Sequence, residues 1–405
     1  MQFSPMMARS PTLLVLLSVT TQATALATHR IAAVHTRAAP LLSTANFGAS
    51  SSAHRSSTPN LRRSSPPCCS LDTAIDRALE DDTRWATRPE RWTESDALEE
   101  CSIGRLDKCG ELLAMARPHN IPSSIGLVLF GAYSVERSYA FFARPPVAAQ
   151  VALSILLTVI VTTTSCIIND YFDYTRGVDT ELNNADRPLV AQRISPTAVK
   201  RMLKWAYAVH IGLLCLVSSA PLRLYVYANT MLTYAYTKHI KPVTFLKNAI
   251  CASVVAMAVG FGAVASAGAF TVGMAAAWPY MLTLFCGFCH RELLMDIGDT
   301  VSDAAAGVRT LPVLLGRRNA LLVSIAPLAV AAVAAAACVP AGPHVAAGRL
   351  LRAAAAAPFA VMAHLAWRVR RRAYAPKALS AAIEFAPAFL LASMLATLAL
   401  TSPYP

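Results

Sequence analysis

Long apolar stretches alternate with short polar segments along most of the chain. Nine such stretches follow Arg117, and those at 147–168 and 319–339 contain no charged residue. A bilayer-spanning helix needs roughly 20 predominantly apolar residues. The pattern therefore predicts an all-α integral membrane protein with nine transmembrane helices, over residues 121–142, 147–168, 199–220, 222–236, 248–268, 270–289, 319–339, 346–367 and 379–401.

Composition agrees with a membrane protein. The 405 residues are 55% hydrophobic and only 15% charged, and the net charge is +13. A soluble globular protein is excluded by this balance. The basic residues lie between apolar stretches or near the N-terminus, and they form no groove interleaved with aromatic residues, so we expect no nucleic-acid binding.

The N-terminal 70 residues have the composition of a targeting leader. They contain six Arg but no Lys, Asp or Glu. An apolar run at 12–20, followed by Ala23-Thr-Ala25, is typical of a signal peptide, and the Arg/Ser-rich continuation is typical of a transit peptide. This arrangement predicts delivery to a plastid, with a mitochondrial or endomembrane destination as the alternative. We expect an acidic linker at 71–116 and the nine-helix domain at 117–405.

Basic residues also predict the orientation of the helices. Lys and Arg are concentrated in the segments that follow the second, fourth, sixth and eighth apolar stretches. Such residues accumulate on the side of the membrane that is not translocated. The four segments are therefore expected on one face, together with the linker.

The acidic residues point to a site on this face. Only eleven follow Arg117, and nine of them occur in two short segments: Asp170, Asp173, Asp179, Glu181 and Asp186, and then Glu292, Asp296, Asp299 and Asp303. Helical spacing places several carboxylates of each segment on one helix face. Facing carboxylates repel each other unless cations neutralise them. Mg²⁺ prefers oxygen ligands and is commonly completed by phosphates, so we expect Mg²⁺ and a diphosphate.

Four basic residues on the same face are candidate ligands of the diphosphate. Lys and Arg both bind phosphate oxygens, Lys as a point charge and Arg as a planar fork. Lys238 is the strongest candidate, because it ends a Tyr-rich apolar stretch. The full set is Arg117, Arg187, Lys238 and Lys247.

These motifs resemble the UbiA superfamily of intramembrane prenyltransferases. The resemblance is carried by Ile168-Asn-Asp-Tyr-Phe-Asp173, Asp186-Arg-Pro188, Tyr234-x-x-x-Lys238 and His290-Arg-Glu-Leu-Leu-Met-Asp296-Ile-Gly-Asp299-Thr-Val-Ser-Asp303. It implies a helical bundle around a central cavity, two Mg²⁺ ions and a polyprenyl diphosphate donor. The implied catalytic residues are Asn169, Asp170, Asp173, Asp299 and Asp303, and Asp296 is a further metal ligand.

The first motif departs from the family pattern. Gly177 stands where a third Asp is expected, and the next acidic residue is Asp179. We predict that Asp179 supplies the missing metal ligand, with Asp186 as the alternative.

The acceptor is the least determined feature of the sequence. The Gly177-Val-Asp179 segment is similar to the corresponding segment of dihydroxynaphthoate prenyltransferases. This similarity predicts an aromatic acceptor and a place in quinone biosynthesis. The Arg291-Glu292 opening of the second motif is similar to the glyceryl-ether lipid branch. A chlorophyll-type acceptor, a terpene cyclase on the same scaffold and a transporter remain alternatives. Membrane lipid is the expected surrounding, and no oligomeric state is predicted.

Overall fold

The computed structural model describes residues 105–241, 243–305, 307–339 and 345–400. They belong to a unit that spans residues 71–405, and the leader predicted at 1–70 lies outside the described residues. Every regular element among them is helical, which agrees with the predicted all-α class. The elements are α4 (Arg105–Ala116), η3 (Pro118–Asn120), α5 (Ile121–Glu136), η4 (Ala140–Ala143), α6 (Pro145–Thr175), α7 (Glu181–Asn184), α8 (Pro196–Leu214), α9 (Ala220–Ala235), η5 (Tyr236–Ile240), α10 (Leu246–Ala267), α11 (Phe270–Gly298), α12 (Thr300–Ala305), α13 (Leu311–Cys338), α14 (Val345–Arg371) and α15 (Pro376–Leu400).

Six of the described helices are long and apolar enough to cross a membrane: α6, α10, α11, α13, α14 and α15. The other three predicted spans fall on α5, α8 and α9, which do not meet that description. Helices α5 and α9 have only 16 residues each, and α8 carries Lys200, Arg201 and Lys204 near its start. The structure therefore supports six candidate spans, and the prediction of nine is not confirmed.

Local sequence signals account for several helix ends. Ser195 and Ser219 begin α8 and α9, where their side chains accept hydrogen bonds from backbone amides inside the helix. Pro follows at the first or second position of both helices, where its missing N–H costs nothing. Gly268 ends α10 with a left-handed conformation (φ 66°).

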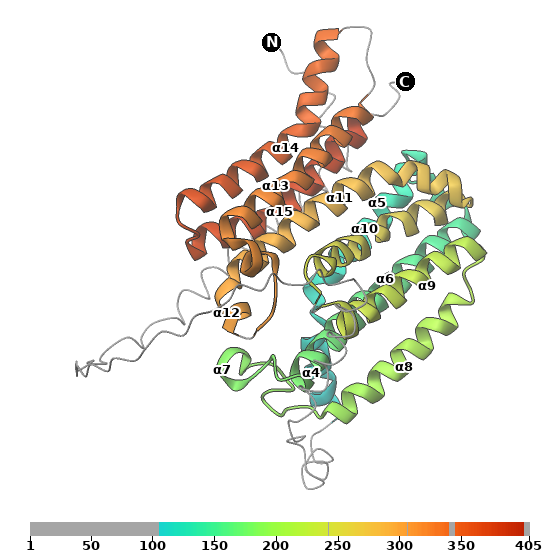
Figure 1. Cartoon of the computed structure of the whole chain (residues 1–405). Coiled ribbons are helices and arrows are strands. Elements are labelled where there is room, and N and C mark those ends of the chain that lie inside the picture. Colours follow the sequence, from blue (N-terminus) through green and yellow to red (C-terminus); the bar gives the residue numbers. More distant parts are fainter. Residues whose placement is uncertain (1–104, 242, 306, 340–344, 401–405) are drawn as a thin grey trace, which may run out of the picture. The chain divides into compact units, whose positions relative to one another are not determined.

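The helices pack through several apolar clusters. One cluster joins α5, α6, α9 and α10, and another joins α10, α11, α13, α14 and α15. Helices α10 and α11 thus connect the earlier helices with the last three, as the ribbon in Figure 1 shows.

Glycine allows the closest helix contact in this core. A Cβ on Gly131 of α5 would lie 1.9 Å from the carbonyl oxygen of Val259, and one on Gly262 of α10 would lie 1.8 Å from that of Val128. Both positions therefore require a residue without a side chain. Small residues let helix backbones approach closely, which is a common packing mode in membranes.

Helix α4 lies within the predicted linker at 71–116 and packs against the helical domain. Met115 and Ala116 at its end are buried in a cluster with Ile167 and Ile168 of α6. The last twelve residues of the predicted 71–116 linker are therefore a packed helix, because they bury apolar side chains against α6.

Candidate functional site

Helix α6 continues beyond its apolar stretch and carries the first acidic motif on its last turns. Asp170 and Asp173 are both buried, with exposed fractions of 6% and 5%. Asp170 Oδ1 lies 2.8 Å from Arg117 Nη2 and 2.7 Å from Arg187 Nη1. Two of the predicted phosphate ligands thus meet at one carboxylate of the motif.

The loop after α6 turns back toward the helix. Gly177 has a φ of 71°, a conformation that residues with a side chain rarely adopt. The backbone amides of Val178 and Asp179 then donate to the carbonyl oxygen of Asp173, at 2.9 and 3.1 Å. This return brings Asp179 back to the end of α6.

Asp179 is part of the acidic cluster, whereas Asp186 is not. The buried Asp179 carboxylate lies 2.7 Å from Arg187 Nη1 and accepts a hydrogen bond of 2.8 Å from Asn184 Nδ2. Burial raises the pKa of the Asp179 carboxyl, and the Arg187 guanidinium opposes that rise. The Asp186 side chain is exposed, and its backbone carbonyl accepts from Arg193 at 2.7 Å.

Lys241, which sequence reasoning missed, is the lysine that contacts the first motif. Its Nζ lies 2.5 Å from Asp173 Oδ1 and 3.0 Å from Asn169 Oδ1. Asn169 Nδ2 in turn donates to Asp173 Oδ2 at 2.9 Å. The predicted Lys238 instead places its Nζ 5.8 Å from the centre of the Tyr234 ring.

A π-helical turn explains why Lys241, and not Lys238, contacts the first motif. In η5 the amide of Lys241 donates to the carbonyl of Tyr236, five residues earlier, at 2.8 Å. A π turn holds one more residue than an α turn and rotates the following side chains. The only sequence signal for Lys241 is its position as the next basic residue after Lys238 and His239.

The second acidic motif lies at the end of α11. The buried Asp296 carboxylate lies 2.7 Å from Lys247 Nζ and accepts a 2.9 Å hydrogen bond from Asn248 Nδ2. Lys247 is one of the four predicted phosphate ligands, whereas Asn248 is a partner that only the structure shows. Both come from the start of α10, so α10 supplies the polar partners of α11 at this point.

Asp299 and Asp303 lie where the helix is interrupted. Asp299 is the exposed residue after α11, and Asp303 on the short helix α12 accepts a 3.1 Å hydrogen bond from Thr310 Oγ1. Partial desolvation raises the pKa of both carboxyls, and the negative charge of Asp296 adds to this effect. The lysine at position 247 opposes the rise at both residues.

One segment connects the two motifs. Lys241 contacts Asp173, and six residues later Lys247 contacts Asp296. Within the described part of the chain, no three His, Cys, Asp or Glu side chains are arranged to hold a metal ion by themselves. The donor set of both motifs is nevertheless composed of oxygen atoms, which is the chemistry that Mg²⁺ prefers.

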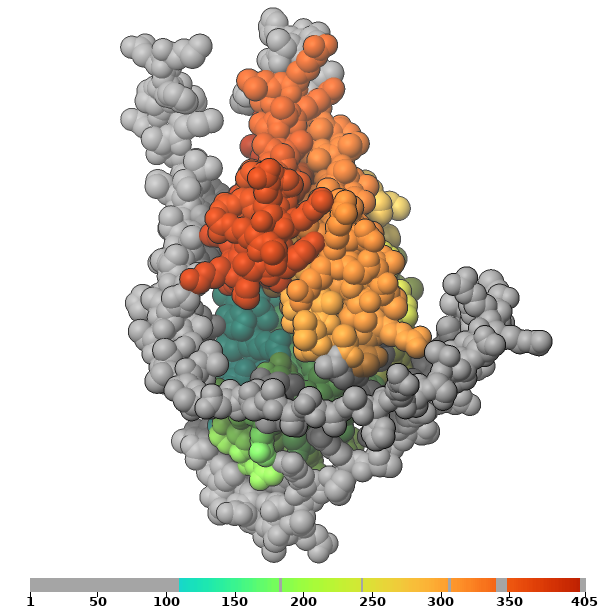
Figure 2. Space-filling model, turned by 60° about the vertical axis from the view of Figure 1, so that its left-hand side comes forward, coloured from blue at the N-terminus to red at the C-terminus, as the bar shows by residue number. Residues whose placement is uncertain are grey.

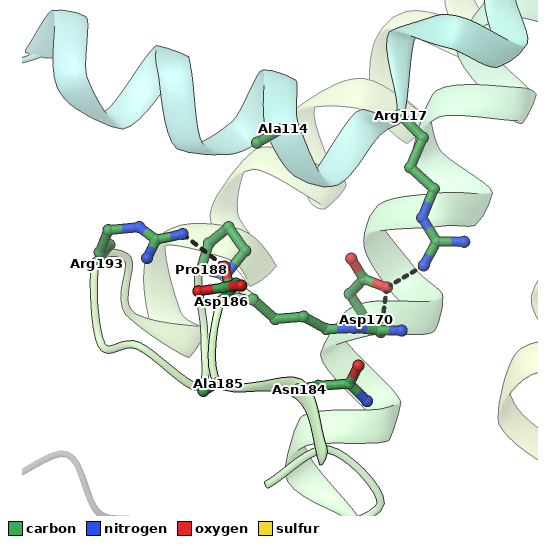
Figure 3. Close-up of a pocket in the computed structure, with 9 residues that line it drawn as sticks. Ala114, Arg117, Asp170, Asn184, Ala185, Asp186, Pro188 and Arg193 are labelled. Atoms are coloured by element: carbon green, nitrogen blue, oxygen red, sulfur yellow. Dashed lines mark hydrogen bonds and ion pairs between the residues drawn. The ribbon is translucent and has the colours of Figure 1, made fainter. Parts of the chain in front are cut away.

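A pocket of about 460 Å³ opens beside the first motif (Figure 3). Arg117, which lines it, has a left-handed backbone (φ 51°) between α4 and η3, a costly conformation for a residue with a side chain. Arg193 is held by Glu111 of α4 at 2.9 Å. The lining residues are Ala114, Arg117, Asp170, Asn184, Ala185, Asp186, Arg187, Pro188 and Arg193.

Fold and site together define a helical membrane protein whose acidic motifs and cations gather at the helix ends. Residues 127–397 match the UbiA prenyltransferase family, and the chain therefore belongs to that family. The resemblance predicted from the motifs is confirmed.

Individual relatives agree with this assignment. A digeranylgeranylglyceryl phosphate synthase of Natronomonas pharaonis is 28% identical over 224 residues, which cover 54% of this chain and 74% of the relative. One of Halobacterium salinarum is 31% identical over 215 residues, covering 53% and 72%. A solved structure of a digeranylgeranylglyceryl phosphate synthase in membranes shares the fold, with a TM-score of 0.54 and 17% identity over 73% of this chain and 98% of that one.

Proposed function

We propose that this prenyltransferase joins a polyprenyl group to a hydroxyl of a glyceryl phosphate acceptor. The observation that carries this proposal is the pair of acidic motifs, each held by cations that can also bind phosphate oxygens. The curated relatives support the acceptor, because both are named for a glyceryl phosphate product. These relatives do not support the aromatic acceptor and the quinone pathway expected from the Gly177-Val-Asp179 segment. Their names fit the glyceryl-ether alternative.

In the proposed reaction the bond between C1 of the prenyl chain and the diphosphate oxygen breaks. A bond between C1 and the acceptor oxygen forms, and the hydroxyl proton is released. Mg²⁺ would neutralise the charge that develops on the leaving diphosphate. The residues that would hold Mg²⁺ are Asp170, Asp173, Asp179, Asp296, Asp299 and Asp303, with Asn169 supporting Asp173 through its side-chain amide.

The basic residues of the site would bind the diphosphate. In the structure Arg117 and Arg187 converge on Asp170 at the pocket, and Lys241 and Lys247 contact the two motifs. With divalent cations held by the carboxylates, these four side chains would donate to phosphate oxygens. Charge-assisted hydrogen bonds of this kind are about twice as strong as neutral ones.

The chain would act inside the membrane. We infer that α5, α8 and α9 complete a nine-helix bundle around a cavity, because all three contribute residues to one apolar cluster with the candidate spans α6 and α10; α8 does so through Leu214. An apolar cavity would exclude water, which otherwise converts the activated prenyl group into the free alcohol.

Plastid delivery by residues 1–70 remains a proposal that rests on the leader's composition. A fluorescent fusion of these residues, expressed in a plastid-containing cell, tests it. Fluorescence in mitochondria or at the cell surface would contradict the plastid assignment, and it would leave the proposed reaction unaffected.

The reaction is tested with purified full-length protein in lipid nanodiscs. Geranylgeranyl diphosphate and Mg²⁺ are supplied with geranylgeranylglyceryl phosphate, dihydroxynaphthoate, homogentisate, hydroxybenzoate or chlorophyllide, one at a time, and products are identified by mass spectrometry. We expect an ether product with the glyceryl phosphate. Prenylation of an aromatic acceptor alone would refute the proposed acceptor, and a cyclic product from the donor alone would indicate a cyclase.

A further inference from the structure

A second group of cations lies outside the site described above, at the turn between α14 and α15. Helix α14 ends in a run of arginines, and α13 adds two more directly after its break at Gly316 (φ 78°). Except for the half-buried Arg317, their side chains are exposed. We call this group the turn patch, and it consists of Arg317, Arg318, Arg368, Arg370, Arg371, Arg372 and Lys377.

Packing holds the turn patch together. The guanidinium of Arg317 lies 5.9 Å from the centre of the Tyr374 ring, so α13 contacts the turn. Ala373 and Tyr374 both have left-handed backbones (φ 48° and 62°), and the amide of Tyr374 donates to the carbonyl of Val369 at 2.9 Å. Consecutive residues in this conformation persist only where the surrounding structure enforces them.

The patch has no internal counter-charge. The cations of the acidic motifs, such as Arg187 and Lys241, each contact a carboxylate. By contrast, no member of the turn patch forms an ion pair within the described residues, and Glu384 further along α15 accepts a hydrogen bond from Ser380. The Nε atom of Arg317 is buried without a hydrogen-bond partner. The charges of the turn patch are therefore open to solvent and to an anionic ligand.

The patch lies at the same helix ends as the second acidic motif. A buried cluster joins Ile297 of α11 to Leu321, Val369 and Leu379 of the last three helices. A Cβ on Gly298 would lie 3.0 Å from a methyl group of Leu379, so α11 and α15 approach closely here. These helix ends belong to four of the six candidate membrane spans. In a bilayer these helix ends would place the turn patch at the level of the lipid headgroups.

Aromatic and apolar neighbours add a lipid-like environment. Trp367 is 46% exposed, and the guanidinium of Arg371 lies 4.5 Å from its ring centre. Trp at the end of a span is typical of the membrane interface. Leu314 and Leu315, both exposed, precede Arg317 in the chain. Figure 2 shows the side of the molecule on which α13, α14 and α15, in orange to red, come forward.

We propose that the turn patch binds the phosphate headgroup of an anionic phospholipid. Its arginines offer several donors to phosphate oxygens, and the adjacent leucines and Trp367 would contact the acyl chains. A free phosphate could use only the first of these features, which is why the structure favours a lipid. This inference is independent of the acceptor proposed above.

The test measures lipid binding to the purified full-length protein in detergent. Phosphatidylglycerol or phosphatidylcholine is titrated, and bound lipids are counted by native mass spectrometry. The variant Arg370→Gln/Arg371→Gln removes two exposed charges from the patch. The matched control, Arg201→Gln/Lys204→Gln, removes two exposed charges from α8. Each basic residue near an anionic membrane surface contributes on the order of 1 kcal/mol, which corresponds to about fivefold in affinity.

We expect the patch variant to bind phosphatidylglycerol roughly tenfold or more weakly than the unmodified protein. The control variant and the binding of phosphatidylcholine should be unchanged. An equal loss in both variants would overturn the proposal, because it would reflect general attraction to a basic surface. Displacement of the lipid by inorganic phosphate at the same concentration would also overturn it, since the site would then be one for free phosphate.

Discussion

A single nitrogen of Arg187 contacts two acidic residues from different parts of the first motif. Its Nη1 atom lies 2.7 Å from Asp170 Oδ1 on α6 and 2.7 Å from Asp179 Oδ2 in the following loop. Both carboxylates are almost fully buried. Removing one partner from such a group leaves uncompensated charge in a poorly solvated position. Arg187 therefore couples the displaced acid Asp179 to the helical part of the motif.

This contact favours Asp179 over Asp186 as the third Mg²⁺ ligand of the first motif. We expect Asp179→Asn to raise the Mg²⁺ concentration needed for half-maximal activity by roughly tenfold or more, because one anionic oxygen ligand is lost. Asp186→Asn, whose carboxylate is exposed, should leave this requirement within about twofold. Activity is measured against Mg²⁺ concentration for both variants. The reverse order would assign the third ligand to Asp186.

Because of the π-helical turn, we expect replacement of Lys241 to lower turnover much more than replacement of Lys238, three residues earlier. Lys241→Met should lower turnover on the order of 10²-fold, because Lys241 contacts the first motif and would bind the leaving diphosphate. Lys238→Met should lower it less than about threefold, since Lys238 faces the Tyr234 ring. Steady-state kinetics of the two purified variants compare them directly. A larger loss of turnover in Lys238→Met than in Lys241→Met would show that Lys238 binds the diphosphate, as the sequence predicts.

Replacing the acids of both motifs should stop the reaction without removing the protein from the membrane. We expect Asp170→Ala, Asp173→Ala, Asp299→Ala and Asp303→Ala each to lower activity by about 10²-fold or more, because each loses an oxygen ligand that balances the leaving diphosphate. EDTA should abolish activity, and Mg²⁺ should restore it. Product formation by membranes and their content of inserted protein are measured together. Full turnover in EDTA by any of these variants would refute the mechanism.

The contact between α5 and α10 gives a prediction about stability. Gly131→Ala or Gly262→Ala would place a methyl group less than 2 Å from a backbone carbonyl oxygen of the other helix. Overpacking of this kind typically costs 1–3 kcal/mol and here forces the backbones apart, so we expect a loss of at least about 2 kcal/mol. Thermal unfolding in detergent measures it. The control is Gly126→Ala on α5, where the added methyl group meets no atom within 4 Å and unfolding should not become easier.

Much of the site followed from local sequence patterns. The apolar stretches predicted where the long helices lie, because a helix that spans a bilayer needs roughly 20 predominantly apolar residues in succession. The spacing of Asp170 and Asp173 placed both on the last turns of one helix, since helical periodicity is a local property. The same expectation was wrong for the second motif, because α11 ends at Gly298, Asp299 follows it, and Asp303 belongs to α12. The family resemblance rested on the same short motifs and was confirmed for residues 127–397.

Only the tertiary structure decided which distant residues meet. The return of the loop at Gly177, the π turn before Lys241 and the approach of Asn248 to Asp296 depend on how helices pack against each other. Helical spacing specifies directions around one helix, but it carries no information about the partner that a side chain faces. Lys238 and Lys241 illustrate this limit, because one extra residue in a turn redirects the side chains that follow. The sequence by itself determined where the apolar helices and the acidic motifs lie, whereas packing between helices decided which cation meets which acid.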